Sequence, residues 1–285
     1  MRVVTRVDGS ADDSWRGVVE SVRRAGVDAG ENDVLDEAAQ LRIKRHGLVD
    51  STLWLAGSDG FALVHDSAVD LAVTPAARGR GLGTDLAAAT LGGDGPVTAW
   101  SHNDHPAAAH LAARHGLRRA RELWVMRRDS RLPLPGLVVP DRLTVRGYRD
   151  EDRDEVLRVN AAAFAHHPEQ GSMDADDLAA RMSEEWFDPA GLLVADAGEG
   201  LRGFHWTKQH DAGLGEVYVV AIDPAAQGQG LGKVLTLAGL QHLHGLGVGE
   251  VLLYVESDNV PAVRVYGGLG FTHADTDTHV QYQRP

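Results

Sequence analysis

The sequence contains no cysteine. Disulfide bonds, thiolate metal ligands and cysteine nucleophiles are therefore excluded, so any group transfer must proceed without a cysteine-bound intermediate. Basic residues are also scarce, because 28 lysines and arginines stand against 41 aspartates and glutamates, for a net charge of −13. Nucleic-acid binding depends on clustered basic side chains. We therefore expect no nucleic-acid partner, whereas a cationic amine would be tolerated as a substrate.

Long apolar runs are absent too. No stretch approaches the roughly 18 apolar residues that a membrane span requires, and the N-terminal sequence MRVVTRVDGSADDSW lacks the apolar core of a signal peptide. These absences predict a cytoplasmic protein with no membrane partner. The 285 residues are enough for two domains of ordinary size.

A proline-rich segment divides the chain near its middle. Residues 130–142, SRLPLPGLVVPDR, resist both helix and central strand. On either side the patterns predict a similar order: an acidic amphipathic helix, three strands, a glycine-rich stretch, a helix, a strand, a short helix ending in glycine and a last strand. We therefore predict an α/β (α+β) fold with a first domain at 1–130, a linker at 131–142 and a second domain at 143–285.

The glycine-rich stretches are nearly identical in the two halves. TPAARGRGLGT spans residues 74–84 and DPAAQGQGLGK spans 223–233, so that Pro75 and Pro224, like the three glycines of each stretch, lie 149 residues apart. A strand, a tight loop and a helix in this order gather unpaired backbone N–H groups at a positive helix end. Such an arrangement suits a phosphate or pyrophosphate, and glycine lets the phosphate approach the amides.

Three kinds of phosphate loop compete for these stretches. A Walker loop requires Ser or Thr after its lysine, but Val234 follows Lys233, and Gln227 occupies the place of its first glycine. A dinucleotide fingerprint has glycines at its first, third and sixth places, whereas here they occupy the first, third and fifth. QGQGLG and RGRGLG resemble the third kind, the coenzyme A pyrophosphate loop of GNAT acetyltransferases, with its pattern Gln/Arg-x-x-Gly-x-Gly/Ala.

A second segment extends this resemblance. SDNVPAVRVYGGLGF, residues 257–271, is similar to the family's Asn-x-x-Ala-x-x-x-Tyr-x-x-x-Gly-Phe segment. The resemblance implies two tandem GNAT domains, each a mixed central sheet flanked by helices, with two parallel strands that splay apart around acetyl-CoA, the acyl donor. In the first half it implies donor contacts from Leu71, Ala72, Val73, Gly79, Arg80, Gly81, Leu82, Gly83 and Thr84. In the second half it implies contacts from Val220, Ala221, Ile222, Gln227, Gly228, Gln229, Gly230, Leu231, Gly232, Lys233, Asn259, Val260, Pro261, Ala262, Val263 and Arg264.

A narrower resemblance is dense from residue 143 to residue 272. EWFDPAGLL, GFHWTK and LLYVESDN, among other segments, resemble tandem GNAT enzymes of actinobacteria that acetylate the cysteinyl α-amine of a cysteinyl-glucosaminyl-inositol, desacetylmycothiol. Acceptor contacts are thereby implied for Glu31, Glu169, Lys208, Glu216 and Tyr254, with Asn32 as an alternative to Glu31. Two other functions stay open: a GNAT enzyme for a different small amine, and a non-catalytic acetyl-CoA sensor.

The chemistry of amine acetylation requires few groups. The amine must lose a proton before it attacks, and the departing coenzyme A thiolate gains from protonation. The resemblance makes Glu216 the candidate base, acting directly or through water, and Tyr266 the candidate acid. Counting residues from the matching motifs gives Ser67 and Ala112 as their counterparts in the first half. We therefore predict a catalytically degenerate first domain.

Two further expectations concern metals and assembly. His166 and His167 have no acidic or histidine partner nearby at ligand spacing, so no metal site is predicted. We also expect a monomer.

Overall fold

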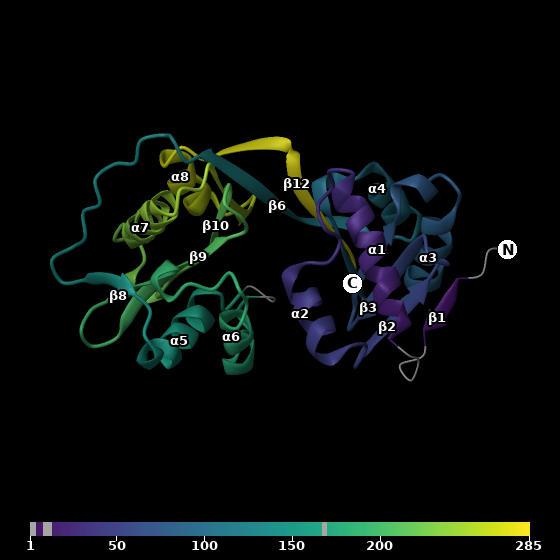
Figure 1. The fold of residues 1–285 in the computed structure, drawn as a ribbon, viewed down its shortest axis with the longest axis horizontal. Coiled ribbons are helices and arrows are strands. Elements are labelled where there is room, and N and C mark those ends of the chain that lie inside the picture. The colour runs from purple at the N-terminus through teal and green to yellow at the C-terminus, as the bar shows by residue number, and fades with distance from the viewer. Residues whose placement is uncertain (1–3, 8–12, 167–169) are drawn as a thin grey trace. The chain divides into compact units, whose positions relative to one another are not determined.

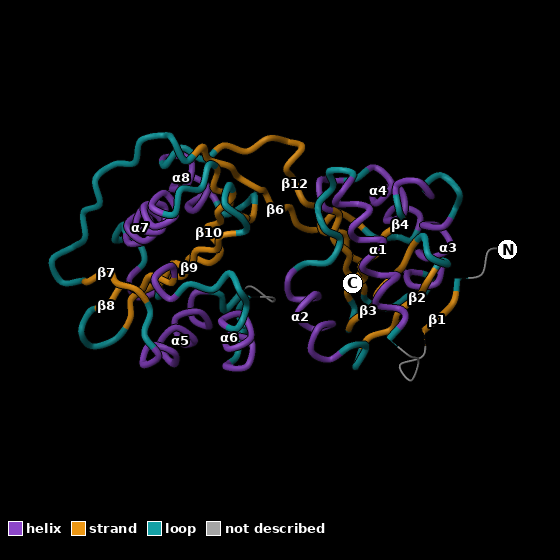
Figure 2. Tube along the Cα trace, in the orientation of Figure 1, coloured by secondary structure: helices purple, strands orange, loops and turns teal. Residues whose placement is uncertain are grey.

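The computed structural model describes residues 4–7, 13–166 and 170–285. The chain forms two compact units, one of Met1–Leu123 with Asp275–Pro285 (unit 1) and one of Trp124–Ala274 (unit 2). Each unit is a sheet with helices on its faces (Figures 1 and 2). Among the described residues, no helix is both long and apolar enough to span a bilayer.

Unit 1 contains a mixed sheet in the order β1-β2-β3-β4-β5-β12. Its strands are β1 (Thr5–Val7), β2 (Ser51–Leu55), β3 (Gly60–His65), β4 (Ala68–Val73), β5 (Val97–Ser101) and the end of β12 (Thr272–Arg284). One core cluster joins the strands to α1 (Ser14–Asp28) and α2 (Glu37–His46), and another joins them to α3 (Leu82–Leu91) and α4 (Pro106–Arg114). The sheet is therefore covered on both faces, as the family resemblance implied.

Unit 2 repeats this plan in the order β6-β11-β10-β9-β8-β7. Its strands are the end of β6 (Arg118–Asp129), β7 (Thr144–Gly147), β8 (Leu192–Asp196), β9 (Leu201–Gln209), β10 (Leu214–Ile222) and β11 (Glu250–Glu256). Helices α5 (Arg153–Ala163) and α6 (Ala175–Met182) lie on one side of the sheet, and α7 (Leu231–Gly245) and α8 (Val260–Gly268) on the other (Figure 1). Short 3-10 helices lie at Pro75–Ala77, His102–Asp104, Asp150–Asp152, Pro189–Gly191 and Pro224–Ala226.

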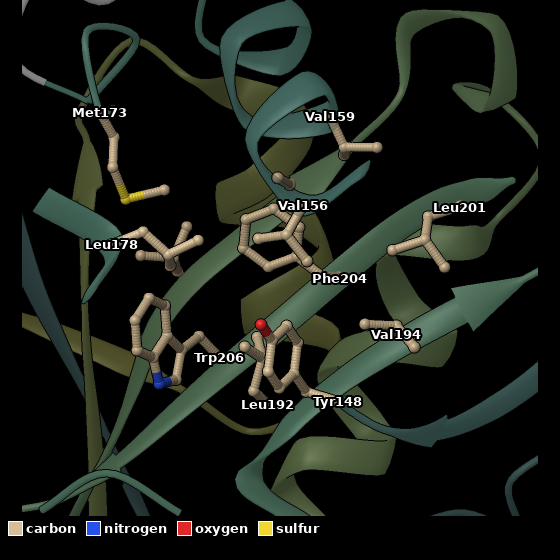
Figure 3. Close-up of a cluster of buried hydrophobic side chains, with 12 residues drawn as sticks. Tyr148, Val156, Val159, Met173, Leu178, Leu192, Val194, Leu201, Phe204 and Trp206 are labelled. Atoms are coloured by element: carbon tan, nitrogen blue, oxygen red, sulfur yellow. The ribbon is translucent and has the colours of Figure 1, made fainter. Parts of the chain in front are cut away.

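The core between the sheet of unit 2 and α5 and α6 follows from simple periodicities. Phe204 and Trp206 are two residues apart on β9 and therefore face the same side, and both are fully buried. Val156 and Val159 are three residues apart on α5 and pack into the same cluster (Figure 3). This core fixes β9 and β10 against the helices that cover them.

The proline-rich segment does not separate the two units. Residues 131–142 form an extended loop between β6 and β7 (Figure 2) and lie within unit 2, which begins at Trp124. Each unit is also completed by a strand from the other half of the sequence, since the end of β12 belongs to unit 1 and the end of β6 to unit 2. The division drawn at 131–142 therefore describes the two sequence repeats rather than the two compact units.

Candidate active site

The parallel strands β10 and β11 of unit 2 separate partway along their length. Their ladder runs from the pair Leu214↔Glu250 to the pair Val217↔Leu253, although β10 continues to Ile222 and β11 to Glu256. In unit 1 the ladder between β4 and β5 consists of the single pair Ala68↔Thr98. Both repeats thus contain the splayed pair of strands that the family resemblance implied.

A β-bulge interrupts β10 beside the point of separation. Val217 pairs with Thr207 and Val219 with Trp206, so Tyr218 is an extra residue outside the ladder. Tyr218 packs against the same core cluster as Val219, on the side of α5 and α6. Tyr218 therefore shares a face with Glu216, as strand alternation requires, and the bulge brings Val219 to this face as well.

Strand β4 of unit 1 has no such bulge. Its ladder with β3 runs without interruption from Gly60↔Val73 to His65↔Ala68. The pair that corresponds to Lys208↔Glu216 is therefore His65↔Ala68, because the bulge adds one residue to β10. The counterpart of Glu216 is thus Ala68 rather than the predicted Ser67, and it likewise lacks a carboxylate.

The glycine loops of both units adopt a left-handed backbone conformation. Gly228 and Gly230 have φ angles of 75° and 80°, and Gly79 and Gly81 have φ angles of 72° and 88°. This left-handed region favours glycine. Gly230 and Gly81 directly precede α7 and α3, and a Cβ added at either would meet no protein atom within 4 Å.

The second loop offers a set of unsatisfied donors. Among the described residues, the backbone N–H groups of residues 228–232 have no hydrogen-bond partner. They lie at the N-terminal end of α7, where the helix dipole is positive. The open space and these donors fit the pyrophosphate of a coenzyme A molecule, whose two phosphates would accept from the N–H groups.

Side chains brace the loops against neighbouring backbone. Gln227 donates from Nε2 to the carbonyl of Ile222 at 3.5 Å, and Arg78, its counterpart in unit 1, donates from Nε to the carbonyl of Val73 at 3.1 Å. Arg142 donates to the amide oxygen of Gln229. These bonds tie each loop to the end of the strand before it and, in unit 2, to the proline-rich segment.

Glu216 lies on β10 with only 6% of its surface exposed. Its Oε2 is 2.6 Å from Nε2 of His210, which follows the end of β9. Lys208 is its direct neighbour across the strands, and Leu252 pairs with it on β11. Tyr254 lies two residues beyond Leu252, so strand alternation places Lys208, Glu216 and Tyr254 on one face of three adjacent strands.

Tyr266 lies on α8, on the other face of the same sheet. Its ring packs beside the core cluster that contains Val217 and Leu253. It also meets the Phe271 ring edge to face, with 6.0 Å between the ring centres. Burial raises the pKa of Tyr266 to about 12, so its hydroxyl stays protonated at neutral pH. Asn259 accepts a hydrogen bond from the backbone N–H of Ala262 and thereby caps α8 at its N-terminus.

Glu31 and Asn32, the other predicted acceptor residues that the structure describes, do not belong to unit 2. Glu169 lies outside the described residues. Glu31 belongs to unit 1, where Arg78 donates to it from Nη1 and, at 2.6 Å, from Nη2, and this ion pair lowers the pKa of Glu31. Asn32, the alternative, donates to Asn103 at 2.9 Å, also in unit 1.

Sequence reasoning missed several residues near the site. His210 could have been found, because a short turn between two predicted strands brings it back toward Glu216. Alternation along β10 could have placed Tyr218 on the face of Glu216, but only the pairing with β9 reveals the bulge beside it. Arg181 and Trp186, which contact Tyr218, are distant in sequence and gave no local pattern.

Comparisons with known proteins agree with this geometry. Residues 158–271 match the model of the acetyltransferase (GNAT) family. The chain is 59% identical to a mycothiol acetyltransferase from a Nocardioides species over 98% of this chain and 100% of that protein. It is 47% identical to the mycothiol acetyltransferase of Actinosynnema mirum over 95% of this chain and 99% of that protein.

Solved structures share the fold at low sequence identity. A tandem GNAT protein from the clavulanic acid biosynthesis pathway is similar with a TM-score of 0.71 and 19% identity, covering 99% of this chain and 98% of that one. A GCN5-related N-acetyltransferase from Sphaerobacter thermophilus has a TM-score of 0.67 and 21% identity, with 94% of this chain and 91% of that chain covered.

Proposed function

The chain belongs to the mycothiol acetyltransferases of the GNAT family, and we propose that unit 2 transfers the acetyl group of acetyl-CoA to the cysteinyl α-amine of desacetylmycothiol. This reaction is the last step of mycothiol biosynthesis. The observation that supports the proposal most directly is the shared face of Lys208, Glu216 and Tyr254 beside the splayed strands. The predicted tandem GNAT fold and acetyl-CoA-dependent enzyme class are confirmed.

Three segments of unit 2 would hold acetyl-CoA. The N–H groups of residues 228–232 bind the pyrophosphate, because they are unpaired and lie at a positive helix end. Backbone groups of residues 220–222 lie where β10 has left its parallel partner, so they can pair with the amides of the pantetheine arm. The first turns of α8, residues 259–264, would line the other side of this arm.

Glu216 acts as the general base on the acceptor ammonium. The amine has an ordinary pKa near 8, so at neutral pH it must lose a proton before it can attack the thioester. His210 holds the Glu216 carboxylate at 2.6 Å and fixes its direction. A positioned base of this kind typically contributes about 10²- to 10⁴-fold in rate.

Tyr266 acts as the general acid on the departing sulfur. Burial raises its pKa to about 12, so the hydroxyl carries its proton at neutral pH and can donate a hydrogen bond to the sulfur. Glu216 and Tyr266 lie on opposite faces of the sheet. The gap between β10 and β11 is the place where both faces meet the thioester, so base and acid can act on its two sides.

Lys208 and Tyr254 would contact the hydroxyl-rich part of the acceptor. Both side chains lie on the Glu216 face, and each provides hydrogen-bonding groups suited to a polyol. Glu169 and Glu31 complete the proposed acceptor set from the sequence resemblance.

Unit 1 would be a degenerate repeat that keeps the phosphate loop without the chemistry. Ala68 and Ala112 stand at the positions of the base and the acid. Asp70 is the carboxyl that unit 1 has on the corresponding face of β4, and burial raises its pKa to about 7. It pairs with Leu63, two positions nearer the loop than Ala68, so it does not replace Glu216.

Coenzyme A release with a panel of acceptors tests the proposal. The cysteinyl-glucosaminyl-inositol conjugate is compared with cysteine amide, glucosamine and an aminoglycoside. We expect kcat/KM to be highest for the conjugate by at least about tenfold. Faster turnover of a simple amine would favour the general GNAT enzyme, and no turnover of any amine with intact acetyl-CoA binding would favour a sensor. The cytoplasmic location and the monomeric state stay predictions.

A further inference from the structure

Two aromatic rings hold the ammonium of Lys208. The Lys208 Nζ lies 4.5 Å from the centre of the Trp186 ring and 5.2 Å from the centre of the Tyr218 ring. Both distances are within the range of a cation–π attraction. The two rings meet edge to face, with 5.1 Å between their centres. Together they form a corner of two aromatic faces around the ammonium.

The corner is built into the core of unit 2. Trp206 is fully buried on β9. The centre of its ring lies 5.5 Å from the centre of the Tyr218 ring and 5.7 Å from that of Trp186. Arg181, on α6, donates from Nη1 to the Tyr218 hydroxyl and lies over the Tyr218 ring at 5.7 Å. Tyr218 lies on the α6 side of the sheet, two residues along β10 from Glu216, and packs against the core cluster there.

The position of Lys208 matters for the neighbouring carboxylate. Lys208 and Glu216 stand directly opposite each other on β9 and β10, where opposite charges ordinarily attract. In the structure the Lys208 ammonium lies over the rings, whereas the Glu216 carboxylate bonds to His210 at 2.6 Å. The rings therefore direct the lysine away from the carboxylate that faces the amine.

Holding the lysine in one place also has an entropic consequence. A lysine loses considerable rotamer freedom when a ligand immobilises it. Two ring faces that already restrict the ammonium reduce the loss that remains at binding. An ammonium held over the rings would therefore meet acceptor hydroxyls from a fixed position.

From these contacts we propose that Trp186 and Tyr218 determine acceptor specificity by fixing the Lys208 ammonium over their rings, so that it binds hydroxyl groups of the sugar or cyclitol. They act as positioning residues, because their effect on the acceptor passes through Lys208. The inference rests on the proposed function, since it assigns these residues to recognition of the polyol part of the acceptor.

The test measures KM separately for each substrate in Trp186→Leu, Trp186→Phe, Lys208→Met and the Trp186→Leu/Lys208→Met double variant. We expect Trp186→Leu to raise KM for the cysteinyl-glucosaminyl-inositol by roughly three- to thirtyfold. KM for acetyl-CoA should not change, and neither should kinetics with cysteine amide, which has no hydroxyl-bearing ring. Trp186→Phe should restore part of the loss, and Trp186→Leu should add little once Lys208 is already methionine.

Phe187→Leu is the matched control, because Phe187 contacts Trp206 at 5.7 Å in the same aromatic cluster. Equal increases of the acceptor KM in Trp186→Leu and Phe187→Leu, or an undiminished effect of Trp186→Leu in the Lys208→Met background, would overturn the inference. If Trp186→Leu does not fold, Tyr218→Phe against Tyr218→Leu replaces it, with loss expected only for leucine. Equal kinetics of those two variants would also overturn the inference.

Failure of the inference and failure of the proposed function are distinguishable. A wild-type enzyme that does not prefer the conjugate over cysteine amide contradicts the proposed function, whatever the variants do. A wild-type enzyme that prefers the conjugate, with variants that keep this preference, contradicts the role of Trp186 and Tyr218 alone.

Discussion

Arg128, near the end of β6, donates from Nε to the carbonyl oxygen of Leu269, which caps the end of α8, at 2.8 Å. The two residues are far apart in the sequence, and the arginine is only 2% exposed. Its other nitrogens donate to main-chain carbonyls of Asp129, Leu132 and Pro133. One buried guanidinium thus joins the first repeat's last strand and the start of the proline-rich segment to the helix that carries Tyr266.

The Arg128 contacts predict that replacing this arginine strongly lowers the stability of unit 2. Arg128→Met leaves these carbonyls without their donor in a buried place, so we expect the free energy of unfolding of unit 2 to fall by roughly 2–4 kcal/mol. Denaturant unfolding followed by tryptophan fluorescence measures it. Arg131→Met is the control, because the Arg131 side chain is mostly exposed and pairs with Asp129 at the surface, so the stability of this variant should stay near wild type. Equal stability of both variants would refute this account of Arg128.

Glu216→Gln should lower turnover most at neutral pH. The amide cannot accept the amine proton, so we expect kcat to fall about 10²- to 10⁴-fold at pH 7. Part of the loss should be recovered above pH 8 or so, where solvent deprotonates the amine. A pH–rate profile beside that of Glu199→Gln, an exposed carboxyl, provides the measurement. Wild-type turnover at pH 7 would remove Glu216 from the mechanism.

Tyr266→Phe should separate chemistry from binding. The ring and its contact with Phe271 remain, so acetyl-CoA affinity should stay close to wild type. Without the hydroxyl, kcat should fall by about tenfold or more, because the thiolate then departs without its acid. Calorimetric titration and steady-state kinetics give the two quantities, with Tyr282→Phe as a control. A loss of affinity would mean that the ring packs against the coenzyme and that the acid lies elsewhere.

Gly230→Val and Gly81→Val should strain the backbone of their loops to a similar extent. Both glycines have left-handed φ angles of 80° and 88°, and a Cβ at either meets no protein atom within 4 Å. The backbone cost of roughly 1–2 kcal/mol is therefore similar. We expect Gly230→Val to abolish acetyl transfer, because its side chain occupies the phosphate space, and Gly81→Val to leave the chemical step largely intact. The reverse outcome in folded proteins would show that unit 1 is the active half.

Acid should destabilise unit 2 through His205. Its Nδ1 donates to the carbonyl of Leu235 at 2.8 Å, it is fully buried, and burial lowers its pKa from 6.5 to about 4. The folded state therefore binds fewer protons than the unfolded state between these values. Stability is retained above pH 6.5 and lost as pH falls toward 4, by roughly 3 kcal/mol in total.

A variant without this titration isolates the effect. We expect His205→Asn to be less stable than wild type at pH 7, and this deficit should shrink as pH falls to 4.5, because only the wild type must protonate the buried ring. Urea unfolding at several pH values follows the difference, with the exposed His110→Asn as reference. A deficit that is constant from pH 7 to pH 4.5 would contradict the assignment to His205.

Features that depend on consecutive residues could be predicted from the sequence. The glycine loops were readable because Gly228 and Gly230 serve one turn between a strand and a helix, and the pattern of that turn is contained in consecutive residues. The positions of Glu216 and Tyr266 on β10 and α8 also followed, although from the family resemblance rather than from periodicity.

Contacts between distant strands were not predictable in this way. The bulge at Tyr218 depends on how β10 registers with β9, so counting residues gave Ser67 instead of Ala68 as the counterpart of Glu216. The contact of Lys208 with Trp186 joins residues from different elements that share no motif. The exchange of β6 and β12 between the units reverses an assumption of the sequence argument, which treated each repeat as a contiguous body.

This exchange has a consequence for the growing chain. In the ladder between β12 and β5, Val280 pairs with Ser101. The sheet of unit 1 is therefore incomplete until β12 has been synthesised, which happens only after the whole of unit 2. Until then β5 presents an unpaired edge, and such edges invite pairing with other chains. Synthesis of β12, rather than completion of the first repeat, is thus the step after which the N-terminal half can finish folding.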